Sequence, residues 1–218
     1  MTKQLQNSEI VDFLCNTEFK AGLFDTLKIR YRTYICPFIE LISLVKPGDK
    51  VADVGCGSGQ FLLLVSRFAD NPESLYGIEI TQRLIDNARE LFSQYASINY
   101  HFETFDGSHF PEELSKVDII FLIDVLHHVP RKHQESFLKN LINIMKPGAR
   151  LVLKDIDGGS PLVFFNRMHD MIFAGEIGNE LKMEKAKELL INNGLRIIEQ
   201  NKRRMYVYPH YTFVAQKD

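Results

Sequence analysis

Glycines at alternate positions follow a short apolar run, and an aspartate lies near the end of that run. The run is VADV at residues 51–54, and Gly55, Gly57 and Gly59 come directly after it. Glycine is favoured where a backbone turns sharply or approaches a ligand closely, because no Cβ stands in the way. A helix that starts after such a loop offers free N–H groups at its N-terminus. The pattern therefore predicts a ligand-binding loop between a strand and a helix, with Asp53 beside it.

Acidic residues also follow the next apolar runs of the chain. Glu79 lies in SLYGIEI, Asp106 precedes Gly107, and Asp124 follows VDIIFLI. Ligands of open α/β sheets bind outside the carboxyl ends of parallel strands, which is where these residues are expected. Glu103 competes with Asp106 for the position after the third strand.

The spacing of the apolar residues predicts strands that alternate with helices from about residue 50 onward. Strands are expected at 50–54, 74–80, 98–102, 117–123, 150–154, 195–199 and 212–215, and helices at 61–68, 81–95, 131–145 and 183–192. Such alternation is typical of a parallel sheet. We therefore predict an α/β fold with a doubly wound, mostly parallel seven-stranded sheet, helices on both faces and an antiparallel C-terminal strand.

The start of the strand–helix alternation at about residue 50 divides the chain into two parts. Residues 1–49 are expected to be helical and to pack on the core or to cover the ligand as a lid. Residues 50–218 are expected to form the sheet domain, with an insertion at about 156–182 that builds an acceptor pocket.

The glycine loop differs from the dinucleotide-binding fingerprint G-x-G-x-x-G, because Gln60 stands where its third glycine would be. The G-x-G-x-G form after an acidic residue instead resembles motif I of the class I S-adenosylmethionine-dependent methyltransferases. DIIFLIDVLHHV and the later LINIMKPGARLVLKD resemble the fourth motif and the following unit of that family. The resemblance covers roughly residues 51–155 and implies S-adenosylmethionine as the cofactor and methyl transfer as the reaction.

The resemblance also implies a set of cofactor contacts at the carboxyl ends of the strands. Asp53 would lie near the α-amino group of the cofactor, Gly55, Gly57 and Gly59 would permit close approach, Glu79 with Ile80 would hold the ribose, Asp106 with Gly107 would hold the adenine amine, and Asp124 would lie beneath the cofactor.

Histidines supply the candidates for catalysis, since neutral imidazole can accept a proton near pH 7. His127 and His128 follow Asp124, and His169 lies after the fifth strand. We predict His128 and His169 as catalytic candidates, with a structural role as the alternative for each, and His210 as a further residue that can reach the same side. The family resemblance provides no fixed catalytic residue.

Composition narrows the class of acceptor. Lysine and arginine number 26 against 28 aspartates and glutamates, which lacks the basic surplus of a nucleic-acid binder. Asp124 is followed by Val-Leu-His rather than by the two prolines and the aromatic residue of amino-methylating DNA enzymes, so DNA is not expected as a partner. Lys202, Arg203 and Arg204 are interpreted as a solvated turn. With little room for a large substrate domain, we expect a small-molecule acceptor, hydrophobic or lipid-like molecules included.

Three cysteines without metal-like spacing predict no metal site and a reducing compartment. The polar N-terminus and the lack of a long apolar run predict a cytoplasmic protein without a membrane span. The oligomeric state is not indicated by the sequence. Two other functions remain open at this level: a nicotinamide-dependent oxidoreductase on a similar sheet, and a non-catalytic module that binds S-adenosylmethionine.

Overall fold

Seven strands form one sheet in the order β3-β2-β1-β4-β5-β7-β6. The computed structural model of the chain describes residues 5–17, 33–164, 168, 171 and 178–218. β1 to β5 are mutually parallel, whereas β7 is antiparallel to both of its neighbours. The strands are β1 (Lys50–Val54), β2 (Ser74–Glu79), β3 (Asn99–Thr104), β4 (Ile119–Ile123), β5 (Arg150–Ile156), β6 (Leu195–Met205) and β7 (Tyr208–Lys217).

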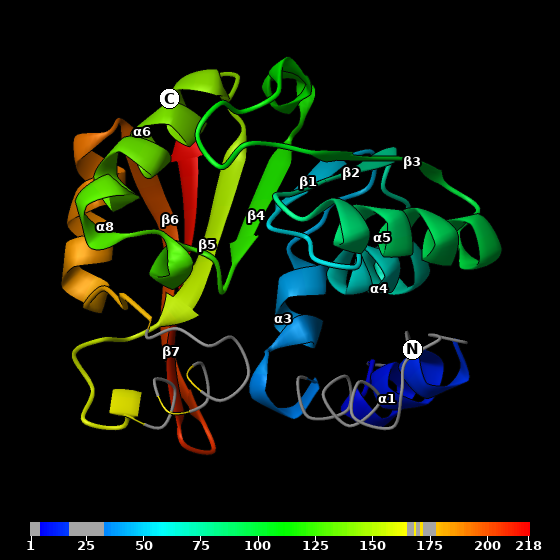
Figure 1. The fold of residues 1–218 in the computed structure, drawn as a ribbon, viewed down its shortest axis with the longest axis horizontal. Coiled ribbons are helices and arrows are strands. Elements are labelled where there is room, and N and C mark those ends of the chain that lie inside the picture. The colour runs from blue at the N-terminus through cyan, green and yellow to red at the C-terminus, as the bar shows by residue number, and fades with distance from the viewer. Residues whose placement is uncertain (1–4, 18–32, 165–167, 169–170, 172–177) are drawn as a thin grey trace.

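Helices cover both faces of the sheet, as Figure 1 shows. One face carries α1 (Asn7–Asn16), α3 (Phe38–Ser43), α4 (Gln60–Phe68) and α5 (Gln82–Tyr95), and the other carries η1 (Glu112–Lys116), α6 (Gln134–Ile144) and α8 (Met183–Asn192). Two short turns of 3₁₀ helix, η2 (Leu126–His128) and η3 (Arg131–His133), lie between β4 and α6. The predicted doubly wound α/β fold with an antiparallel C-terminal strand is confirmed.

The burial of β4 explains its central place. Every residue of Ile119–Ile123 is buried, as expected for a parallel strand that is covered on both faces. The described part of the N-terminal region packs on the α4 side of the sheet through Ile10, Leu14 and Phe38, which lie in the core. The role of residues 1–49 as a lid, and of residues 156–182 as an acceptor pocket, stays a prediction.

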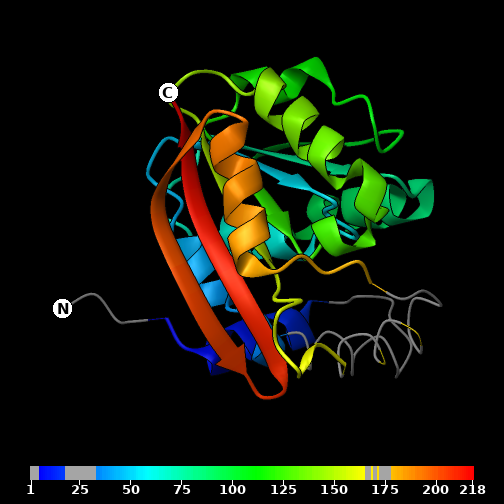
Figure 2. The same cartoon turned by 90° about the vertical axis from the view of Figure 1, so that its left-hand side faces the viewer.

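The last two strands are longer than the sequence predicted, and the interpretation of Lys202, Arg203 and Arg204 as a turn was wrong. All three belong to β6, where Lys202 pairs with Tyr211 in β7. Figure 2 shows β6 and β7 as a long ribbon at one edge of the sheet. Polar, charged residues suit an edge strand because they discourage pairing with another chain, and they hide the strand from a search for apolar runs.

Several other boundaries differ by a few residues from those predicted. The stretch expected as one helix at 131–145 begins as the 3₁₀ turn η3 and becomes α-helical at α6. Among the described residues, the helices lack the length and apolar character needed to cross a membrane.

Gly77 in β2 is required by close packing rather than by a turn. A Cβ on Gly77 would lie 2.4 Å from Cδ1 of Phe102 in β3 and 2.9 Å from Sγ of Cys56. The ring of Phe102 therefore lies over Gly77 of β2. It also contacts the ring of Phe92 in α5 edge to face. This contact joins the sheet to α5.

We expect Gly77→Ala to lower the free energy of unfolding by roughly 1–3 kcal/mol, because the added methyl group overpacks the core. Gly194→Ala is the control: Gly194 has a φ of +87° with open space around it, so only the backbone penalty of about 1 kcal/mol applies there. Urea unfolding of both variants measures the difference. A smaller loss for Gly77→Ala than for Gly194→Ala would contradict this account of the packing.

Candidate functional site

The loop between β1 and α4 (residues 55–59, the glycine loop) has a backbone that demands its glycines. Gly55, Gly57 and Gly59 have φ angles of 78°, 54° and 78°. These values lie in the left-handed region, which other residues enter at a cost. The N–H groups of Gly55 and Cys56 donate to the carbonyl of Ile78 at 2.8 and 3.0 Å, which ties the loop to β2.

Glu79 supports the loop from the end of β2. Its carboxylate accepts hydrogen bonds from the N–H of Gly57 and from that of Thr81, both at 3.2 Å. Each carboxylate oxygen retains a second lone pair for a ligand. A Cβ on Gly57 would meet no described atom within 4 Å, so the loop faces open space beside Glu79.

The walls around this space come from the neighbouring loops. A Cβ on Gly55 would lie 2.5 Å from Cγ2 of Val125, so the glycine loop touches the turn after β4. Ile80 is 65% exposed, and a Cβ on Gly107 would lie 3.7 Å from it. An exposed apolar side chain next to Glu79 offers a flat ligand ring a surface on which to pack. Asp53 is buried at the carboxyl end of β1.

Asp106 closes the turn of its own loop. Its Oδ1 accepts the N–H groups of Ser108 and His109, both at 2.7 Å, and its Oδ2 lies 2.5 Å from Nδ1 of His109. These hydrogen bonds, that of His109 above all, hold the pKa of Asp106 well below its usual range. They favour the role of a turn residue, and its contact with a ligand stays a prediction. The competitor Glu103 accepts a hydrogen bond from Tyr76.

Asp124 follows β4 and has a backbone conformation that is uncommon for residues other than glycine. Its φ is +56°, and both of its carboxylate oxygens accept hydrogen bonds from Nζ of Lys154 in β5, at 2.6 and 2.7 Å. The Lys154 side chain is 1% exposed, so the ion pair holds a buried ammonium. A buried cation is tolerated only when it is paired in this way. The pair fixes the turn that follows β4 (residues 124–128, the β4 turn).

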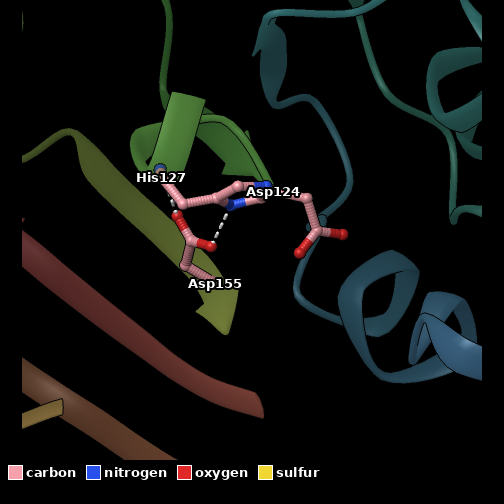
Figure 3. A group of neighbouring side chains, drawn as sticks. All are labelled: Asp124, His127 and Asp155. Carbon is pink, nitrogen blue, oxygen red and sulfur yellow. Dashed lines mark hydrogen bonds and ion pairs between the residues drawn. The ribbon is translucent and has the colours of Figure 1, made fainter. Parts of the chain in front are cut away.

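The next residue of β5 holds the other end of the β4 turn. Nδ1 of His127 lies 2.5 Å from Oδ1 of Asp155, and the N–H of His127 donates to Oδ2 of Asp155 at 3.1 Å. Both side chains are buried. Figure 3 shows the imidazole turned toward Asp155, with Asp124 extending to the other side. Successive residues of a strand point to opposite faces, so Lys154 and Asp155 hold the turn from both faces of the sheet.

His128, the predicted catalytic residue, is exposed in the same turn, and the centroid of its ring lies 4.0 Å from that of His127. His169, the second candidate, lies outside the described residues. His210 is buried in β7. The structure therefore brings His127, His128 and Asp124 together at the end of β4.

Asp124, His127 and Asp155 each offer a ligand atom within 4.8 Å of the others, which is short enough for a metal ion. The ammonium of Lys154 already supplies a positive charge to Asp124, and His127 is directed at Asp155. This charge balance favours a hydrogen-bonded network over a metal centre. Burial raises the pKa of the Cys56 thiol well above its usual range, so this cysteine in the glycine loop remains a neutral thiol.

Sequence reasoning missed Lys154 and Asp155. They lie near the end of RLVLKDI, where two adjacent charged residues in a strand that is buried throughout are a signal of a polar site. Their partners lie 30 and 28 residues earlier in the chain, so the pairing itself depends on the order of the strands.

Residues 45–208 match the family described as a methyltransferase domain, and this is most of the chain. The chain therefore belongs to that family, which uses S-adenosylmethionine. Its sheet is that of the class I methyltransferases. The glycine loop fits this cofactor, since open space lies above Gly57 and Glu79 has acceptor capacity for ribose hydroxyls.

Curated relatives are similar over part of their length. An O-methyltransferase from Pyrenophora dematioidea is 25% identical over 167 residues, which are 75% of this chain and 60% of that protein. A ubiquinone biosynthesis O-methyltransferase from Coxiella burnetii is 29% identical over 110 residues, which are 50% of this chain and 44% of that protein. The chain thus spans about half the length of the curated relatives that it matches.

Solved structures share the fold at low sequence identity. Magnesium protoporphyrin IX methyltransferase from Synechocystis with bound S-adenosylhomocysteine has a TM-score of 0.70 at 19% identity, over 98% of this chain and 100% of that one. A [4+2]-cyclase has a TM-score of 0.65 at 18% identity, over 82% of this chain and 78% of that one. Two different reactions are named for this one fold, so the site must decide the chemistry.

We expect Glu79→Ala to weaken the binding of S-adenosylhomocysteine roughly 10- to 100-fold, because hydrogen bonds to a charged group are lost and the Gly57 N–H loses its acceptor. Glu73→Ala is the matched control, since Glu73 precedes the opposite end of β2 and pairs with Lys50 at the surface. Isothermal titration calorimetry measures both affinities. Equal affinity in the wild type and Glu79→Ala would show that Glu79 does not support this ligand.

Burial, and next the charge of Lys154, lower the pKa of His210 from 6.5 to about 4. Between these values the unfolded chain binds a proton that the folded chain does not, so stability rises with pH and is lost as the pH falls from 6.5 toward 4. The contribution is up to about 3 kcal/mol. We expect His210→Phe to lose less unfolding free energy than the wild type as the pH falls from 6.5 to 4, as measured by urea unfolding. The surface variant His133→Gln should show the same change of unfolding free energy with pH as the wild type. The same change in His210→Phe would contradict the prediction.

Proposed function

We propose that the protein transfers the methyl group of S-adenosylmethionine to a hydroxyl oxygen of a small-molecule acceptor, and that His127 is the general base. The observation that carries this proposal is the buried pair of His127 and Asp155 beside Asp124 at the carboxyl end of β4. A base is useful when the acceptor is a hydroxyl, which must lose its proton as the oxygen is methylated.

The residues of the site divide the work as follows. The glycine loop, Asp53 and Glu79 hold the cofactor, which when bound supplies an electrophilic methyl group on its sulfonium. Nδ1–H of His127 donates to Asp155, which leaves the lone pair of the imidazole on Nε2. The acceptor hydroxyl would give its proton to this Nε2 as its oxygen takes the methyl group that the sulfonium of the cofactor would supply. Asp155 stabilises the imidazolium that results, as the carboxylate of a Ser-His-Asp triad does.

The relatives support an oxygen acceptor and a small molecule, since two of them, matched over 75% and 50% of this chain, carry the name O-methyltransferase. Exposed apolar side chains support a hydrophobic acceptor. Phe164, Met168 and Met171 are all exposed, and they follow β5 in the region predicted to build the acceptor pocket. Exposed apolar side chains in this region suit a ligand with a large hydrocarbon part.

A non-catalytic module that binds the cofactor is the other function that the site must be tested against. The structural likeness to a cyclase shows that this fold hosts more than methyl transfer. The geometry of His127 with Asp155 favours the enzyme, because a buried, oriented imidazole near the cofactor edge is suited to proton transfer as well as to holding the β4 turn.

The test uses S-adenosylmethionine with a labelled methyl group and three hydroxyl acceptors: catechol, hexylphenol and octanol. We expect the wild type to methylate at least one of them. His127→Gln should lower kcat roughly 100-fold or more, because the base is removed. Asp155→Asn should lower it in the same direction, because the amide favours the wrong tautomer of the imidazole.

His128→Gln is the matched control for this test, since His128 lies in the same turn and is exposed. We expect it to keep most of the activity. A loss confined to His128→Gln would assign the base to His128 instead of His127. No labelled product from any acceptor, together with tight binding of S-adenosylmethionine, would favour the non-catalytic module.

A further inference from the structure

His210 is a buried imidazole whose hydrogen-bonding capacity is unused. It is 3% exposed, and neither Nδ1 nor Nε2 has a hydrogen-bond partner in the part of the chain that the structure describes. The backbone of Ile35 lies near enough to raise the pKa of His210 slightly, but it does not reach hydrogen-bond geometry. Buried polar groups are almost always paired, so an unpaired ring calls for an explanation. A ligand that pairs with it is one such explanation.

His210 lies at the same end of the sheet as the β4 turn. It lies opposite Ile156 at the end of β5. Residues two apart in a strand point to the same face of the sheet, so His210 shares a face with Thr212 and with Lys154, the partner of Thr212. β4 and β7 both neighbour β5, so His210 lies about 10 Å across the sheet from the β4 turn, at two strand spacings. Lys154, Asp124 and Asp155 are near enough to act on its charge.

The surroundings of His210 suit a neutral group rather than an ion. The charge of Lys154 is taken up by both oxygens of Asp124, and Asp155 is engaged by His127. The imidazole itself is kept neutral by its burial and by Lys154. A neutral imidazole presents one N–H donor and one lone pair, which together match a hydroxyl, or singly a carbonyl or an ether oxygen.

We propose that His210 binds a neutral polar group of the acceptor and thereby determines acceptor specificity at the β5–β7 end of the site. This inference rests on the proposed function, and it assigns to His210 a role in binding and none in proton transfer. The group that it binds is a second polar group of the acceptor, away from the oxygen that is methylated. Molecules with two neutral oxygen groups, such as catechol, should therefore be preferred over octanol.

Tyr211 provides a matched control within the same strand. Its hydroxyl is also buried without a partner among the described residues, but its side chain belongs to the core on the α6 and α8 face. Replacing either side chain with Phe removes a buried polar group that lacks a partner. A purely structural account predicts the same outcome for both, a melting temperature that is unchanged or raised and unaltered kinetics.

The experiment measures the melting temperature, the Kd of S-adenosylhomocysteine, and KM and kcat for catechol in the wild type, His210→Phe, His210→Gln and Tyr211→Phe. We expect His210→Phe to raise KM at least 10-fold with kcat and cofactor Kd within about 2-fold of the wild type and with no fall in melting temperature. His210→Gln, which keeps a donor and an acceptor, should recover part of the loss. Tyr211→Phe should leave KM unchanged. An unchanged KM in His210→Phe would overturn the proposal.

A second measurement separates this proposal from the proposed function, because it needs no turnover. The ¹⁵N signals of the His210 ring are followed by NMR in the wild type loaded with S-adenosylhomocysteine, and they are identified by their loss in His210→Phe. Catechol should shift these signals and octanol should shift them less. If catechol binds and shifts them but no methyl group is transferred, the proposed function fails and the role of His210 stands. If neither catechol nor hexylphenol shifts them, the role of His210 fails.

Discussion

The ion pair between Lys154 and Asp124 is the interaction on which the site depends. It places an ammonium in the interior at the ends of β5 and β4, with both carboxylate oxygens at hydrogen-bond distance. Removing one partner of such a buried pair commonly costs roughly 3–5 kcal/mol, because the other charge is left uncompensated. This constraint holds Asp124 at its positive φ and so sets the direction in which the chain leaves β4. In that direction, the chain brings His127 to Asp155.

The alternation of side chains along β5 divides the site into two parts. Lys154 faces the side of α3 and α4, where it neutralises Asp124 and keeps the surroundings of His210 free of net charge. Asp155 faces the side of α6 and α8, where it orients His127. Two adjacent residues of one strand thus support the two proposed tasks, with Asp155 behind the proton transfer by His127 and Lys154 beside the binding of the acceptor by His210. The glycine loop and Glu79 lie on the far side of the β4 turn, with Gly55 in contact with Val125.

The sequence predicted the local elements well, because each depends on neighbouring residues. The apolar runs predicted β1 to β5, and the glycines predicted the loop, which the positive φ angles of Gly55, Gly57 and Gly59 confirm. It could not give the pairs Lys154–Asp124 and His127–Asp155, because these arise only when β4 and β5 lie side by side. The predicted strand at 195–199 was also too short, because the charged residues in the rest of β6 resemble those of a loop. Gly107 after Asp106 is also typical of a plain turn, and the hydrogen bonds of Asp106 favour its role as a turn residue.

A crystal structure of the protein with S-adenosylhomocysteine would test whether the methyl group is transferred at the ends of β4 and β5. We expect the ribose hydroxyls to lie on the Glu79 carboxylate, and the sulfur to face the β4 turn on the side from which Nε2 of His127 and the ring of His210 can both be reached. A complex in which Glu79 makes no ribose contact, or in which the sulfur points toward α5 and away from both histidines, would contradict it.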